Sequence, residues 1–115
     1  MNQFSAETRL HSFIVFWPRY VCEHSHPVNR ALHFIGSTFG LICLIETVVT
    51  GNFWFILVGL LIGYGLAWTG HFFIEHNKPA TFKYPLWSFR ADWKMWLLML
   101  SGSMGEEVRR TMDKA

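Results

Sequence analysis

The sequence predicts an all-α membrane protein, in which an antiparallel hairpin of two transmembrane spans has interfacial amphipathic helices before and after it. The 115 residues suit a single domain. Of these residues 51% are hydrophobic and only 16% are charged, a composition more hydrophobic than that of a typical soluble domain. Two apolar segments are each long enough to cross a bilayer core. A short turn joins them, and every basic residue lies outside the pair.

The first predicted element is an interfacial helix over residues 4–20, where Phe16 and Trp17 alternate with Arg9 and Arg19. Aromatic side chains beside basic ones are typical of helices at the level of the lipid headgroups. The same stretch lacks a basic segment followed by an apolar run, so we expect no cleaved signal peptide.

The two predicted spans cover residues 31–50 and 53–74. The second is 22 residues long with His71 as its only strongly polar member, and it meets the length that the hydrocarbon core requires. Glu46 is costly in lipid, but its place near the turn lets it reach the headgroups. Glycine and asparagine at residues 51–52 give that turn its backbone freedom.

Both spans contain glycines four residues apart, a spacing that allows close helix packing, although glycine is also simply frequent in membrane helices. The pairs are Gly36 with Gly40 and Gly59 with Gly63. A turn centred on residues 51–52 would set Gly40 opposite Gly63 and His33 opposite Gly70 and His71.

A second interfacial helix is predicted over residues 85–100, and residues 102–115 form a polar tail that is either a solvated helix or a frayed end. Three basic residues precede the hairpin and the other seven follow it, which places both termini in the cytoplasm by the positive-inside rule. The net charge of +2, without a basic cluster among surface aromatics, argues against a nucleic-acid partner. Cys22 and Cys43 lie in unlike surroundings and form no metal knuckle.

The clearest chemical signal is a set of ionisable residues at the cytoplasmic mouth of the hairpin. His33 lies about two turns into the first span, while His71 and Glu75 are four residues apart and share one helix face. His24 approaches from the preceding loop. Ionisable groups at membrane depth tend to mark function, and imidazoles with a carboxylate but no thiolate suit iron(II), manganese or zinc.

Each of these residues also has a simpler interpretation. A lone His33 or His71 is more often a hydrogen-bonded interfacial histidine than a ligand, and Glu75 could instead pair with Arg30 or Lys78. Two rival functions therefore stay open: a haem-binding helix pair, and a non-enzymatic hairpin that binds lipid or a protein partner.

Two motifs, H-x-x-P-V-N-R-x-L-H-x-x-G from His24 and G-H-F-x-x-E-x-N-x-P-A-T-F from Gly70, resemble the membrane family that includes the 2-hydroxy-palmitic acid dioxygenase of phytosphingosine breakdown. The resemblance covers residues 10–100, and the YPLWS and DWKMW stretches are similar to its short bacterial branch. It implies an iron(II) enzyme of the bacterial inner membrane that uses O₂ to release one carbon of a 2-hydroxy fatty acid as CO₂. The positions that match its motifs are His24, Asn29, His33, His71 and Glu75, and His26 and His76 carry less weight.

The resemblance implies roles for these positions. Iron(II) would be held by His24, His33 and His71, with Glu75 either a fourth ligand or a group behind the ligands. Asn29 joins Glu75 as a catalytic candidate, and Asp92 is a third, able to fix a histidine tautomer.

The resemblance also implies how the chain binds its substrate and contacts lipid. Arg30 or Lys78 would attract the substrate carboxylate from the cytoplasmic side, and the acyl tail would lie along the hairpin and the interfacial helices. Membrane lipid is a further expected partner, as is a second copy of the chain, because a hairpin this small encloses little space.

Overall fold

The structure, a computed structural model, describes residues 10–114 and contains helices but no strand over that range. The helices form two compact units, one of His26–Pro79 and the other of the residues up to Ser25 together with those from Ala80 onward. The single domain that the sequence predicts stays a prediction.

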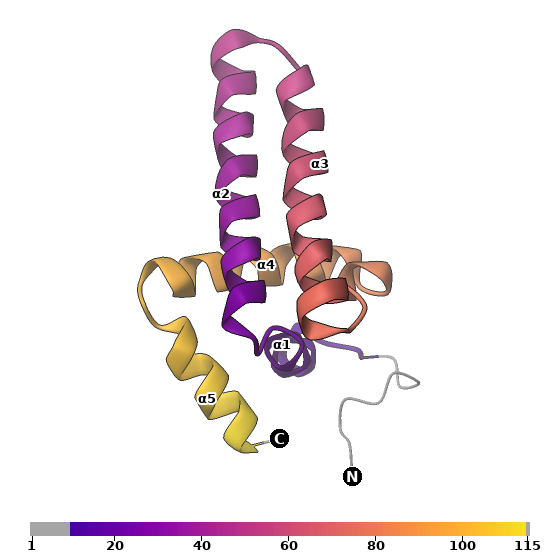
Figure 1. Cartoon of the computed structure of the whole chain (residues 1–115), viewed down its shortest axis with the longest axis vertical. Coiled ribbons are helices and arrows are strands. Elements are labelled where there is room, and N and C mark those ends of the chain that lie inside the picture. Colours follow the sequence, from indigo (N-terminus) through magenta and orange to yellow (C-terminus); the bar gives the residue numbers. More distant parts are fainter. Residues whose placement is uncertain (1–9, 115) are drawn as a thin grey trace. The chain divides into compact units, whose positions relative to one another are not determined.

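The first unit is an antiparallel hairpin of α2 (Pro27–Thr50) and α3 (Trp54–Thr69), which continues as the π-helix η1 (Gly70–Glu75) (Figure 1). Pro27 occupies the first turn of α2, where its missing N–H costs nothing, and the His26 side chain caps the helix by accepting from the Val28 N–H at 3.1 Å. Gly51 ends α2 in the left-handed conformation at φ 73°. Both α2 and the continuous stretch Trp54–Glu75 are long and apolar enough to cross a membrane.

Glycines bring the backbones of α2 and α3 into contact. A Cβ on Gly36 would lie 2.9 Å from the Gly63 carbonyl oxygen, and one on Gly40 would lie 4.0 Å from the Gly59 carbonyl oxygen. The predicted register, with Gly40 opposite Gly63, is therefore wrong by one turn. The predicted register was taken from the midpoint of the turn. In the structure, the close approach of the small residues sets the register.

The outer surface of the hairpin is apolar and exposed. Val48 and Phe53 are 78% and 76% exposed, and Phe73 is 72% exposed. Only 22% of the apolar window of α2 and 17% of that of the second helix are buried inside the protein. A core helix of a soluble protein would be mostly buried.

The second unit contains α1 (Phe13–Cys22), the 3-10 turn η2 (Ala80–Phe82), α4 (Pro85–Leu100) and α5 (Met104–Lys114). Residues 4–9 of the predicted first interfacial helix lie outside the described range. The helix predicted over 85–100 coincides with α4, and α5 lies within the predicted polar tail.

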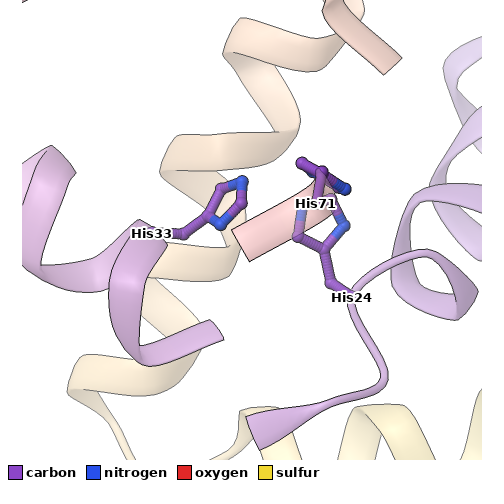
Figure 2. Close-up of side chains that lie close together, drawn as sticks. All are labelled: His24, His33 and His71. Atoms are coloured by element: carbon purple, nitrogen blue, oxygen red, sulfur yellow. The ribbon is translucent and has the colours of Figure 1, made fainter. Parts of the chain in front are cut away.

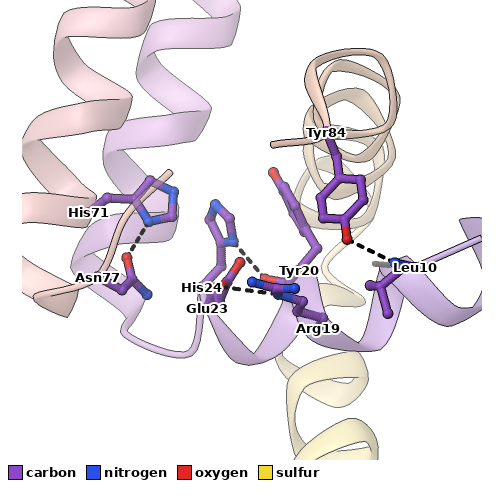
Figure 3. Close-up of polar contacts among 8 residues, drawn as sticks. All are labelled: Leu10, Arg19, Tyr20, Glu23, His24, His71, Asn77 and Tyr84. Atoms are coloured by element: carbon purple, nitrogen blue, oxygen red, sulfur yellow. Dashed lines mark hydrogen bonds and ion pairs between the residues drawn. The ribbon is translucent and has the colours of Figure 1, made fainter. Parts of the chain in front are cut away.

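A core of mainly aromatic and sulfur-containing side chains holds this second unit together. Its buried members are Leu10, Phe16, Trp17, Tyr20, Val21, Tyr84, Ala91, Met95 and Met104. The Tyr84 hydroxyl accepts a hydrogen bond from the Leu10 N–H at 2.8 Å (Figure 3), and the Trp17 indole donates to Glu107 of α5 at 2.6 Å. The aromatic faces of α1 and α4 thus pack in a protein core.

Candidate metal centre

His33 lies in the second turn of α2 and is buried, with 5% of its surface exposed. Its Nδ1 lies 3.0 Å from the carbonyl oxygen of Asn29, one turn earlier. A carbonyl can only accept, so Nδ1 carries the proton and Nε2 carries the lone pair. The helix itself therefore sets the tautomer of this histidine.

His71 is fixed in the same way, but by a side chain. It is the second residue of η1 and is 2% exposed. Its Nδ1 lies 2.6 Å from the Asn77 side-chain oxygen (Figure 3), and its own carbonyl accepts the Asn77 N–H at 2.9 Å. The contact depends on His76, which ends η1 in the left-handed conformation at φ 59° and turns the chain back.

Within the hairpin, the rings of His33 and His71 meet edge to face. Their centroids are 5.0 Å apart and their planes are inclined at 88°. The sequence predicted that the hairpin brings these two residues to one depth, and the structure places them in contact.

His24 follows α1 and is 1% exposed. Its Nδ1 lies 2.6 Å from the Tyr20 carbonyl oxygen, and its ring stacks on the Tyr20 ring with centroids 3.9 Å apart. The Tyr20 hydroxyl in turn donates to the Asp92 carboxylate. Burial raises the pKa of Asp92 to about 7 and, with the Asp92 charge, raises that of Tyr20 well above 10.0.

His24 belongs to the second unit and His33 and His71 to the hairpin, and all three side chains are buried (Figure 2). In all three, a carbonyl oxygen accepts from Nδ1, which leaves Nε2 as the basic nitrogen. Each of these three histidines offers one ring nitrogen to a metal ion. This buried group could hold a metal ion.

Glu75 is not part of this histidine group. Its Oε2 accepts from the His26 N–H at 3.0 Å and from the Asn29 side-chain amide at 3.3 Å. The carboxylate thus lies at the N-terminus of α2, where the helix dipole favours a negative charge.

Asn29 is completely buried, and its side-chain oxygen has no hydrogen-bond partner. That oxygen occupies the space where any Cβ on Gly70 would have to sit. A buried oxygen without a hydrogen-bond partner is energetically costly. Asn29 lies one turn before His33, so its unpaired oxygen is a feature that a ligand-binding site would contain.

The other predicted site residues lie at the margins. Arg30 is half-buried and interacts electrostatically with Glu75, while Lys78 is exposed. His26 and His76 are exposed and serve as helix-terminal residues. The Asp92 carboxylate accepts a hydrogen bond from the Tyr20 hydroxyl.

Sequence reasoning missed the acceptors that orient the imidazoles. It did not identify Asn77 as a partner of His71 and gave Tyr20 no role. A helical i, i+4 spacing signals the pairing of His33 with the Asn29 carbonyl and of His24 with the Tyr20 carbonyl. No comparable signal indicates the π-helix that brings Asn77 to His71.

The fold and the site together define a small helical protein with a histidine-lined candidate metal centre. The chain belongs to the 2-hydroxy-palmitic acid dioxygenase Mpo1-like family, whose model matches residues 10–104. This confirms the resemblance inferred from the two motifs. No curated protein and no solved structure matches the chain.

Proposed function

We propose that the chain is a membrane-embedded, iron(II)-dependent dioxygenase that shortens 2-hydroxy fatty acids by one carbon. The observation that carries the proposal is the buried group of His24, His33 and His71 in a chain of the 2-hydroxy-palmitic acid dioxygenase family. The overall reaction balances as 2-hydroxypalmitate plus O₂ giving pentadecanoate, CO₂ and water.

The donor set suits iron(II). Three neutral imidazoles without a thiolate match zinc, copper, iron or nickel, and the family name supplies the oxygen chemistry that favours iron. His24, His33 and His71 would hold the iron(II), which would supply the activation of O₂. The chain's own part is to hold His24, His33 and His71 in the tautomer that offers Nε2.

The remaining predicted residues take supporting roles in this proposal. Glu75 holds the Asn29 amide, which leaves the unpaired Asn29 oxygen as an acceptor for the substrate hydroxyl. Arg30 and Lys78 attract the substrate carboxylate. Asp92 acts through Tyr20, whose carbonyl orients His24.

The hairpin contacts the acyl chain of the substrate and the surrounding lipid. Two apolar helices with mostly exposed side chains need an apolar environment, since water in contact with this much apolar surface is unfavourable. We therefore place both helices across a bilayer, with both termini on the cytoplasmic side as the basic residues indicate.

The test is O₂ uptake by the purified full-length chain after anaerobic loading with iron(II). We expect uptake with 2-hydroxypalmitate, with pentadecanoate detected by mass spectrometry, and none with palmitate, which lacks the hydroxyl. His33→Ala should abolish it, whereas His11→Ala, which changes an exposed histidine, should not. Equal uptake by His33→Ala and wild type would contradict the proposal, as would a haem Soret band in the active protein.

A further inference from the structure

Asn77 holds His71 at two points. The Asn77 N–H donates to the His71 carbonyl at 2.9 Å, and the Asn77 side-chain oxygen lies 2.6 Å from His71 Nδ1. The first contact belongs to the backbone and survives any substitution except proline. The second belongs to the side chain and can be removed alone.

This side-chain contact distinguishes His71 from the other two histidines of the group. His24 and His33 use the main-chain carbonyls of Tyr20 and Asn29, which no substitution removes. Only His71 depends on a side chain for its acceptor. The tautomer of one ligand is thus controlled by a single replaceable residue.

The contact between Asn77 and His71 depends on how the helix ends. A continuing α-helix would carry residue 77 well beyond His71 along the axis. Here the π-helix Gly70–Glu75 and the left-handed His76 turn the chain back, so that Asn77 lies beside the ring six residues earlier. π-helical turns inside α-helices occur frequently at functional sites.

We propose that Asn77 is a positioning residue for the metal centre: its Oδ1 accepts the His71 Nδ1 proton and so keeps the His71 Nε2 lone pair directed at the ion. This inference rests on the proposed metal site. Without the acceptor, His71 can turn about its side-chain bonds and place its proton on Nε2, which blocks ligation. Loss of such an outer contact typically lowers metal affinity by about 10–100-fold.

The experiment measures the affinity of the detergent-solubilised full chain for iron(II) and for cobalt(II), whose absorption bands report the number and geometry of ligands. Asn77→Leu keeps a similar volume but offers no acceptor, and Asn77→Asp keeps the acceptor oxygen. We expect Asn77→Leu to bind both metals about 10–100-fold more weakly with altered cobalt bands, and Asn77→Asp to bind at least as tightly as wild type. Thermal unfolding without metal checks that both variants are folded.

The outcomes separate this inference from the metal site itself. If wild type binds metal but Asn77→Leu binds equally well, or if Asn77→Asp is as weak as Asn77→Leu, then Asn77 does not act through its oxygen and the inference is overturned. If wild type binds neither metal, the proposed metal centre is itself wrong, and the inference falls with it.

Discussion

Gly36→Ala should force α2 and α3 apart. The added methyl would lie 2.9 Å from the Gly63 carbonyl oxygen and 3.3 Å from the Gly63 Cα. Both are backbone atoms, which cannot rotate away as a side chain can, so one helix must shift. The shift matters for the site because His33 lies one turn before Gly36 on the same helix.

The size of the effect follows from comparison with Gly65→Ala. A Cβ on Gly65 meets nothing within 4 Å, so this variant gains the alanine helix propensity of about 1 kcal/mol without a clash. Gly36→Ala gains the same propensity but overpacks the helix contact, at a cost of about 1–3 kcal/mol. The free energy of unfolding of Gly36→Ala should therefore fall below that of Gly65→Ala by about 1–3 kcal/mol.

Unfolding of the detergent-solubilised chain, followed by circular dichroism, measures this difference, and metal titration measures its effect on the site. Gly40→Ala serves as a second control, because its methyl would make only an ordinary contact at 4.0 Å. It should behave like Gly65→Ala. If Gly36→Ala unfolds within about 0.5 kcal/mol of Gly65→Ala and binds metal equally well, the helices do not pack through these glycines.

Two further predictions concern the second unit. Burial raises the pKa of Asp92 from 3.8 to about 7, so the folded state binds more protons than the unfolded state in that range, and stability should fall as pH rises from about 4 to 7. Asp92→Asn should remove on the order of 3–4 kcal/mol of this dependence, seen as the wild-type-minus-variant difference across a pH series of unfolding curves; a pH-independent difference would contradict it. Tyr84→Phe leaves the Leu10 N–H without its acceptor and should cost about 1–3 kcal/mol in denaturant unfolding, and an unchanged midpoint would refute the contact.

Hydropathy and turn chemistry predicted the hairpin well, because both signals are local. Proline at the start of α2 and glycine at its end specify the helix boundaries directly. The register could not be read in the same way. The register depends on which glycines of one helix contact which glycines of the other, and these residues are far apart in the sequence. The midpoint of the connecting loop predicts this register only to within one helical turn.

The histidine group was predictable in outline for a similar reason. The antiparallel hairpin brings His33 and His71 to one end, and His24 is only nine residues before His33. The role of Asn77 was not predictable, because it requires a π-helix and a left-handed His76, neither of which has a sequence signature here. The predicted interfacial helices show a further limit, since aromatic residues beside basic ones also occur where the ammonium group of the exposed Lys94 lies 4.3 Å from the centroid of the buried Trp17 ring.

The most direct test of the account is X-ray absorption at the iron edge of the full chain loaded with iron(II) without oxygen, together with the ratio of iron to protein. We expect one iron per chain, with outer-shell scattering from three imidazoles in wild type and from two in His71→Ala. Scattering from oxygen ligands alone, or imidazole scattering unchanged by His71→Ala, would contradict a centre built from His24, His33 and His71.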